Sequence, residues 1–226
     1  KDGVPYHGDK KNIQPGYWKF KNVDGSEDNQ ITESDKTIIG NALPDFYGGI
    51  NNTFSWKDFD LSIFFTYSYG AEVLNATKLT NTKTALTNKN VLSVADDAHR
   101  WVTINANGEL ITNPEELAAV NRGKTIAHFG DNGSNNTYIH SWAIEDASYL
   151  KLSNITLGYT FPKKVINKIG LTKLRLYATG NNLFTWTPYT GFDPEVSTMS
   201  SALTPGVDFG AYPRSRSFVF GVNVAF

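Results

Sequence analysis

Residues 216–226 read R-S-F-V-F-G-V-N-V-A-F and alternate strictly between two kinds of side chain. One face of this stretch is apolar and uncharged, and it carries Phe218, Phe220, Val222, Val224 and Phe226. Such alternation is typical of a β-strand whose two faces meet different surroundings. Because the ends of soluble domains are usually frayed and polar, this stretch favours a strand that closes a transmembrane β-barrel and serves as its assembly signal.

Four further segments show the same period of two: Phe46–Trp56, Phe59–Tyr69, Tyr149–Phe161 and Leu174–Phe184. Each is close to the ~9–11 residues that a tilted strand needs to cross a bilayer. The apolar side chains that we expect to face lipid are Phe59, Leu61, Ile63, Phe65, Ile155, Leu157 and Tyr159. The sequence therefore predicts an all-β, membrane-spanning segment of an antiparallel β-barrel.

The connections alternate between short and long. Two residues, 57–58, separate the first pair of strands, whereas residues 70–148 separate the second strand from the third. Outer-membrane barrels combine brief periplasmic turns with long external loops, whereas a compact soluble domain rarely contains a loop beyond ~12–15 residues. We therefore expect external loops at 1–45, 70–148 and 185–215, transmembrane hairpins at 46–69 and 149–184, and a closing strand at 216–226 that ends in the periplasm.

Local signals add detail to this plan. Asn113 precedes Pro114 and two glutamates, which predicts a helix start within the long 70–148 loop. A second short helix is expected over Val91–Trp101. Aromatic residues near the predicted strand ends would form the two interfacial bands of a membrane protein, and they are Trp56, Tyr67, Tyr69, Tyr149, Tyr159, Phe161, Phe184 and Trp186.

Composition restricts the possible functions. A formal net charge of −1 in 226 residues gives no basic footprint for nucleic acid, and the absence of cysteine excludes a thiol nucleophile or a cysteine-based zinc site. The four histidines show no metal-binding spacing, and the paired acids are interpreted as solvated helix starts. We therefore expect no enzymatic activity, no catalytic residue and no cofactor.

Two interpretations of the apolar faces remain open at this stage. Five strands cannot close a barrel, since single-chain barrels begin at about eight strands. The membrane interpretation therefore requires more strands, which we expect upstream of residue 1. The alternative is a soluble carbohydrate-binding β-sandwich, in which a second protein layer covers the apolar side chains.

Several segments resemble the C-terminal part of the SusC/RagA family of TonB-dependent outer-membrane transporters of Bacteroidetes. They are T-I-I-G-N at 37–41, S-Y-L-K-L-S-N-I-T-L-G-Y at 148–159, L-R-L-Y-A-T-G-N-N-L-F-T at 174–185, G-F-D-P-E at 191–195 and the closing 212–226. The resemblance implies a large, plugged, 22-stranded barrel in the outer membrane of a Gram-negative bacterium. It also implies a SusD-like surface lipoprotein as a lid, the TonB complex acting through an N-terminal part outside this chain, and an oligosaccharide or peptide as cargo. A barrel of this family that serves only as a scaffold in a surface complex is the alternative.

The resemblance also points to residues in the loops. A calcium-loop pattern of the family is degraded here to Asn22, Asp24, Ser26 and Asp35, with two residues inserted before Ile31, which favours a polar external turn over a bound calcium ion. Aromatic rings in external segments could contact the cargo or the lid, and the candidates are Trp101, Trp142, Tyr189, Phe192 and Tyr212.

Overall fold

The computed structural model describes residues 3–8, 13–82, 90–128, 138–198 and 203–226. The chain forms two compact units. The first, here called the loop unit, comprises Lys1–Ile39 and Asn75–Ala143. The second, the sheet unit, comprises Gly40–Leu74 and Ile144–Phe226.

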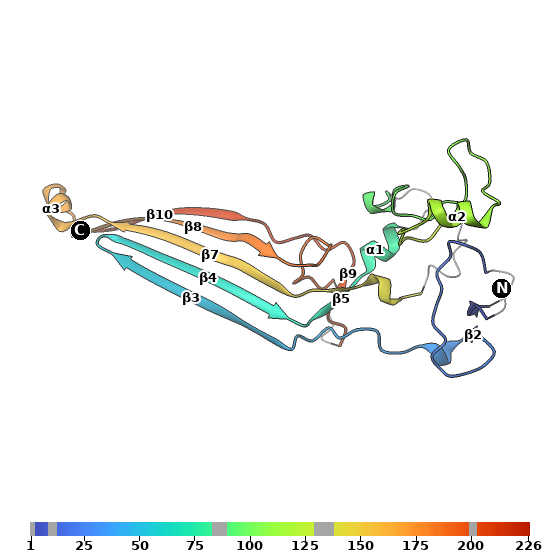
Figure 1. Cartoon of the computed structure of the whole chain (residues 1–226). Helices are drawn as coiled ribbons and strands as arrows, with labels where there is room; N and C mark the ends of the chain where they lie inside the picture. The colour runs from blue at the N-terminus through green and yellow to red at the C-terminus, as the bar shows by residue number, and fades with distance from the viewer. Residues whose placement is uncertain (1–2, 9–12, 83–89, 129–137, 199–202) are drawn as a thin grey trace. The chain divides into compact units, whose positions relative to one another are not determined.

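The sheet unit is built on five long antiparallel strands that lie side by side in one layer (Figure 1). They are β3 (Phe46–Trp56), β4 (Phe59–Tyr69), β7 (Tyr149–Thr160), β8 (Lys173–Trp186) and β10 (Ser217–Ala225). Their order across the sheet is β10-β8-β7-β4-β3. The alternation in the sequence therefore located all five strands, and the largest difference is at β8, which continues to Trp186 where the prediction ends at Phe184.

The short connections gather at one end of the sheet. The two-residue turn after β3 places Lys57 in the left-handed region at φ 53°, and the Thr160 N–H donates to the Asp58 carbonyl across to the next hairpin. The link after β7 contains a short helix, α3 (Lys163–Ile166), and a 3-10 turn, η5 (Asn167–Ile169), neither of which the sequence predicted. The Thr172 N–H donates to the Ala225 carbonyl, so the end of β10 lies at this same end of the sheet.

Two bulges interrupt the alternation of β7 and β8. The register of β7 shifts against both neighbours between Leu152 and Asn154, and Asn182 of β8 adopts a left-handed φ of 51°. An extra residue in a strand reverses which side chains face each way. On the far side of the β7 bulge the apolar face is therefore continued by even-numbered residues such as Leu152, and Lys151 turns to the polar face.

Among the described residues of the sheet unit, none forms a layer that covers the apolar face of the sheet. Leu157 is 51 % exposed and Val222 is 59 % exposed, and Ile63 is also partly exposed. The buried apolar residues of this unit lie elsewhere, in a small cluster of Val73, Ala147 and Tyr189 and at Ile166. A soluble sandwich would bury the apolar face instead.

That small cluster belongs to a second, minor sheet. It consists of β5 (Glu72–Asn75), β6 (Ile144–Asp146) and β9 (Val207–Asp208), in the order β6-β5-β9. The sequence predicted only loops there. Short strands from three distant segments pair because the long connections fold back on one another, and no local pattern in the sequence signals such pairing.

The loop unit contains short elements only. They are β1 (Tyr6–His7), β2 (Gln30–Ile31), η2 (Glu33–Asp35), α1 (Ala76–Asn81), η3 (Ser93–Ala95), α2 (Pro114–Val120) and η4 (Ser141–Ala143). The predicted start of α2 is confirmed, since the Asn113 side chain accepts hydrogen bonds from the N–H groups of Glu115 and Glu116. The helix predicted over Val91–Trp101 is wrong, because two separate turns form there: η3, and a turn in which the Arg100 N–H donates to the Asp96 carbonyl. Within the described residues, no helix combines the length and apolar composition needed to cross a bilayer.

Candidate functional site

The polar face of the sheet carries an ion pair that spans three strands. Arg175 of β8 donates from Nε to Oδ1 of Asp60 in β4 at 3.0 Å, and from a terminal nitrogen to Oδ2 at 2.5 Å. β7 lies between these two strands, and Gly158 is its residue beneath the pair. A Cβ atom at Gly158 would collide with both charged groups, so the glycine permits the bidentate contact.

Neutral polar groups continue this face toward the middle of the sheet. Asn154 donates to Asn181 at 2.7 Å, and Asn181 donates in turn to Ser217 Oγ of β10 at 3.0 Å. The hydroxyls of Thr156 and Thr179 lie 2.8 Å apart. The face opposite the apolar one is therefore a hydrogen-bonded polar surface, of the kind that lines a water-filled lumen.

A buried charge cluster lies near the end of β7 where the long connections begin. The Lys151 side chain is 4 % exposed and donates from Nζ to Oε2 of Glu195 at 2.5 Å. The Tyr149 hydroxyl donates to Oε1 of the same carboxylate at 2.8 Å, and an Arg214 nitrogen lies 3.5 Å from Oε2. Asp193, also buried, accepts a hydrogen bond from the Glu195 N–H at 3.0 Å.

The cluster stabilises the charged form of Glu195. Burial by itself would raise the pKa of the Glu195 carboxyl, but hydrogen bonds from Lys151 and Tyr149 outweigh burial and hold that pKa below its usual value of 4.5. A lowered pKa in the folded state means that the stabilisation is present at neutral pH and is lost only as the pH falls through the lowered value. The motifs and patterns in the sequence did not predict this cluster. The available signal was Lys151, the single charged residue of β7.

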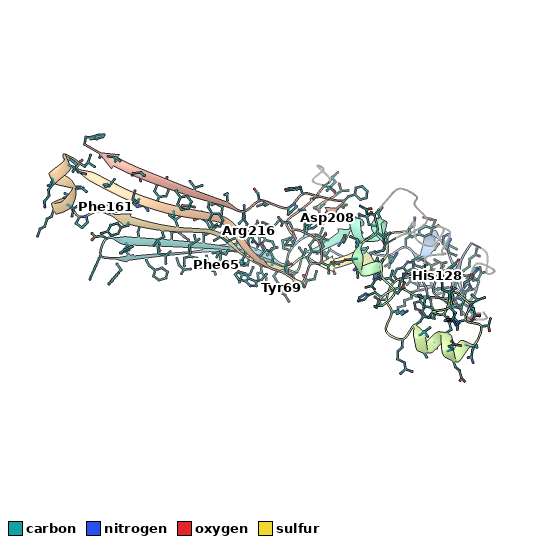
Figure 2. The ribbon with its side chains drawn as sticks, turned by 90° about the horizontal axis from the view of Figure 1, so that it is seen from above. Phe65, Tyr69, His128, Phe161, Asp208 and Arg216 are labelled. Atoms are coloured by element: carbon teal, nitrogen blue, oxygen red, sulfur yellow. The ribbon has the colours of Figure 1, made fainter. Side chains whose placement is uncertain are left out.

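The residues predicted to face lipid lie together on the apolar face. The register opposes Phe59 to Tyr159, Leu61 to Leu157 and Ile63 to Ile155, and Phe65 lies on the same face of β4. The apolar residues of β10 extend this face, since Phe220 opposes Ala178 and Val222 opposes Leu176 of β8. Phe220 is 80 % exposed. Figure 2 shows the sheet from above, with Phe161 and Tyr69 labelled near its opposite ends.

Aromatic rings gather at both ends of the apolar face. At the end with the short connections, Tyr159 lies 4.7 Å from Phe59 and 4.9 Å from Phe161 between ring centroids. At the other end, Phe46 stacks on Tyr69 with centroids 5.0 Å apart. Tyr149, which was predicted to join these bands, instead donates its hydroxyl to Glu195 on the polar face because it precedes the β7 bulge.

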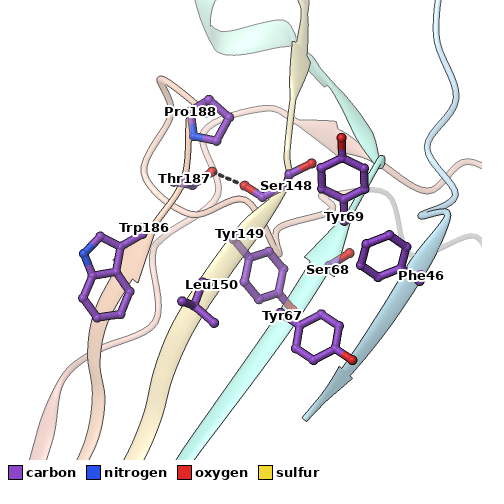
Figure 3. A pocket seen from close by; sticks show the side chains of 10 residues that line it. All are labelled: Phe46, Tyr67, Ser68, Tyr69, Ser148, Tyr149, Leu150, Trp186, Thr187 and Pro188. Atoms are coloured by element: carbon purple, nitrogen blue, oxygen red, sulfur yellow. Dashed lines mark hydrogen bonds between the residues drawn. The ribbon is translucent and has the colours of Figure 1, made fainter. Parts of the chain in front are cut away.

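A shallow groove of about 390 Å³ lies between the strand ends at this second aromatic band (Figure 3). Its lining residues are Phe46, Tyr67, Ser68, Tyr69, Ser148, Tyr149, Leu150, Trp186, Thr187 and Pro188. The Thr187 hydroxyl donates to the Ser148 carbonyl at 2.8 Å at one side of the groove. An aromatic and partly hydroxylated surface of this kind suits the boundary between hydrocarbon and water.

The five aromatic candidates for cargo or lid contacts divide into three kinds. Phe192 is 78 % exposed and Tyr212 is 90 % exposed, so both present surface to a ligand. Tyr189 is a correction, because it is only 5 % exposed and its hydroxyl donates to Asp208 at 2.6 Å. Burial and that hydrogen bond raise the pKa of the Tyr189 phenol. This residue is part of the minor sheet's core and not of an exposed contact surface.

The other two candidates lie in the loop unit and are half-buried. Trp142 packs against Trp18 with ring centroids 5.2 Å apart, and the Lys78 ammonium lies 4.4 Å from the Trp142 ring centroid. Trp101 lies beside Gly16. A cleft of about 460 Å³ in the same unit is lined by residues 4–7 and 13–20.

The segment with the degraded calcium-loop pattern forms a turn in which carboxylate oxygens accept hydrogen bonds from the turn's own backbone N–H groups. Oδ1 of Asp35 accepts hydrogen bonds from the N–H groups of Val23 and Asp24, and its Oδ2 accepts from the Thr32 N–H. These backbone hydrogen bonds, that from Thr32 first, lower the pKa of the Asp35 carboxyl. Asn22 donates to Ser26, and Asp24 accepts from the Ser26 N–H. Across the described residues, no three or more histidine or carboxylate side chains gather as a possible metal site.

Comparison with known proteins finds relatives along nearly the whole chain. TonB-dependent receptor P3 of Formosa agariphila is 34 % identical over 217 residues, which cover 94 % of this chain and 19 % of the relative. TonB-dependent receptor P39 of the same organism is 31 % identical over 238 residues, which cover 100 % of this chain and 21 % of the relative. TonB-dependent receptor SusC of Bacteroides thetaiotaomicron is 29 % identical, over 90 % of this chain and 17 % of the relative. No family model matches the chain.

Solved structures show the same fold. A structure of the RagAB peptide transporter superposes with a TM-score of 0.64 at 22 % identity, covering 88 % of this chain and 19 % of that chain. A structure of the RagAB peptide importer in the open-open state gives a TM-score of 0.65 at 24 % identity, covering 91 % of this chain and 20 % of that chain.

These findings place the chain in the class of TonB-dependent receptors. Within that class it belongs to the SusC/RagA family, as the motifs in its sequence indicated. The chain spans about a fifth of the length of the curated relatives that it matches.

Proposed function

We propose that this chain forms part of the barrel wall of an outer-membrane importer that works with TonB. The observation that carries the proposal is the contrast between the two faces of the five-stranded sheet. The apolar face is uncovered within the sheet unit, and the opposite face is polar and hydrogen-bonded across its strands. Hydrocarbon outside and a water-filled lumen inside explain both faces together.

The proposal includes a closed barrel that is larger than this chain. Among the described strands, β3 and β10 each have only one neighbour in the sheet. Unpaired backbone N–H and C=O groups at a strand edge in lipid cost several kcal/mol each, so further strands must pair with both edges. A 22-stranded, plugged barrel is the form that the family resemblance supports. In it the long connections are external and Phe226 lies at the periplasmic side.

The partners proposed for the complete protein follow from the same family. A SusD-like surface lipoprotein would cover the external segments, and the TonB complex would drive a plug outside this chain. The cargo would be an oligosaccharide or a peptide, and the likeness to a peptide transporter supports the peptide. The role is transport, and it requires no catalytic group from this chain.

Gene deletion in the source organism tests the proposal. The deletion strain should lose growth on one class of oligosaccharide or peptide while it still grows on free monosaccharide and amino acids. The full-length gene should restore growth, and a pull-down from the outer membrane should recover a surface lipoprotein. Restored lipoprotein recovery without any cargo-dependent growth would favour the scaffold role, and a receptor found outside the membrane fraction would contradict the proposal.

A further inference from the structure

The segment that connects β8 to β10 folds back onto the sheet unit. We call its described residues, 187–198 and 203–214, the strap. The start of the strap is held at the rim of the sheet by the Thr187 hydroxyl, which donates to the Ser148 carbonyl, and by Thr190, which donates to the Glu145 carboxylate. The strap also places Tyr189 in the core of the minor sheet.

One further attachment reaches beyond the rim, onto a long strand. Glu195 of the strap accepts hydrogen bonds from Lys151 and Tyr149 of β7. Lys151 opposes Thr66 of β4 and Thr185 of β8 in the register, so it points to the polar face. The strap therefore lies against the same face that carries the Asp60–Arg175 pair.

This attachment also connects the first part of the strap, residues 187–198, to its second part, residues 203–214. Arg214 approaches Oε2 of Glu195 at 3.5 Å, and its N–H donates to Asp193 at 3.4 Å. Residues 191–195 and 212–214 are two of the motifs that the sequence analysis identified, and here they meet at one point. Phe192 and Tyr212 lie within these motifs, and they are the most exposed aromatic residues in the described part of the strap, ahead of Phe209.

The charges in this contact depend on each other. Lys151 is 4 % exposed and Glu195 is 18 % exposed, so removal of either charge leaves the other buried without its partner. Breaking one side of a buried ion pair is far more damaging than removing both charges. Arg214 is 59 % exposed, and its contact contributes much less.

We propose that Glu195 is a positioning residue that fastens the strap to the lumen face near the external end of the barrel and so presents Phe192 and Tyr212 to entering cargo. The inference rests on the proposed function, which makes the polar face the lumen. The motif at 191–195 then has a structural role. Its Glu195 binds Lys151 of β7, and its Asp193 accepts a hydrogen bond from the Arg214 N–H in the second part of the strap.

The test uses the complete receptor with Glu195→Gln, and it has two readouts. Hydrogen–deuterium exchange of the purified receptor should increase within the strap and remain unchanged in β3 and β4. Cargo uptake should require a several-fold higher cargo concentration for half-saturation, with an unchanged maximal rate per receptor. Arg214→Gln should change both readouts only slightly, and Glu115→Gln, an exposed glutamate of the loop unit, should change neither.

Three results would contradict the proposal. Unchanged exchange in the strap would mean that Glu195 does not fasten it, and increased exchange throughout β7 and β8 would mean that Glu195 only stabilises the sheet. Faster strap exchange with unchanged half-saturation would remove the link to cargo. If Glu195→Gln does not accumulate, the double variant Lys151→Met/Glu195→Gln replaces it, because it leaves no buried charge.

The two measurements, hydrogen–deuterium exchange and cargo uptake, also separate the proposal for Glu195 from the proposed transport function. Failure of the wild-type receptor to take up any cargo would contradict the proposed transport function. The exchange measurement would still decide whether Glu195 fastens the strap, because that measurement does not depend on transport.

Discussion

Gly158 shows how a single small residue permits a long-range contact in this sheet. The Asp60–Arg175 pair joins β4 to β8 across β7, and the guanidinium and carboxylate occupy the space that a side chain at position 158 would fill. Glycine in a strand interior usually weakens the strand, and it is found where other groups must approach the backbone closely. The ion pair is the group that requires it here.

Gly158→Ala should therefore destabilise the receptor by about 1–3 kcal/mol, since the methyl group forces the ion pair out of its bidentate geometry. The measurement is the temperature at which the receptor in detergent loses its folded electrophoretic mobility. In a background where Asp60 and Arg175 are both alanine, the same change should have a much smaller effect, because the three atoms nearest to the added methyl group are then absent. Equal losses in the two backgrounds would contradict the explanation.

The two faces of β10 differ in the polarity and the size of their side chains. Its apolar side chains are largely exposed, with Phe218 at 67 % and Phe220 at 80 %, and Phe226 directly after the strand is 91 % exposed. On the opposite face Gly221 pairs with Tyr177 of β8, whose ring lies directly over it. The exposed apolar face fits the predicted assembly signal.

Phe226→Asp should lower the amount of receptor in the outer membrane, because a charge at the end of the apolar face weakens both assembly and lipid contact. Immunoblotting of the outer-membrane fraction measures this amount. Asn223→Asp adds the same charge to the polar face of the same strand, beside Arg175 in the register, and should leave the amount unchanged. If both variants accumulate like the wild type, the assembly role of Phe226 is wrong.

In the sheet unit as a whole, the apolar face of the five-stranded sheet is exposed. A soluble protein of this size would hold Ile63, Leu157 and Val222 beneath another layer, but all three are partly or largely exposed. The buried apolar residues of the unit belong to the minor sheet and to Ile166 beside the short β7–β8 link. Under the proposed function, lipid covers this apolar face and water covers the opposite one.

Ile63→Arg should cost about 2–4 kcal/mol, because it places a charge on the lipid-facing side near the middle of a strand. Ser62→Arg, one residue earlier on the polar face, should cost much less. Urea titration of the complete receptor refolded into lipid vesicles compares the two free energies of unfolding. Equal costs would mean that the two faces meet the same solvent, and the membrane interpretation would then be wrong.

The strands could be predicted from the sequence because their cause is local. Alternation of side chains along one segment determines which residues pair in a strand and which face each takes, and this held for all five strands. The same local reasoning found the start of α2 at Asn113. It failed over Val91–Trp101, where two separate turns form and no helix, and where residues such as Val94 and Asp97 are weak helix formers.

The contacts that build the candidate site depend on residues far apart in the chain. Lys151 and Glu195 are 44 positions apart, and Asp60 and Arg175 are 115 apart. Neither pair has a spacing that a periodic pattern reveals. The bulge that turns Lys151 toward the polar face depends on the register with two neighbouring strands, and the burial of Tyr189 depends on Val73 and Ala147.

Alternating polarity was thus sufficient to identify a sheet with two unlike faces, because each strand carries a different kind of side chain on each face. The family was indicated separately, by the resemblance of several sequence motifs. Which charges meet on the polar face, and where the strap attaches, follow only from the tertiary arrangement. These contacts form when the backbone register and the folding of the long connections bring distant side chains within a few ångströms. Each charge there needs a complementary partner, because a buried charge without one is strongly destabilising.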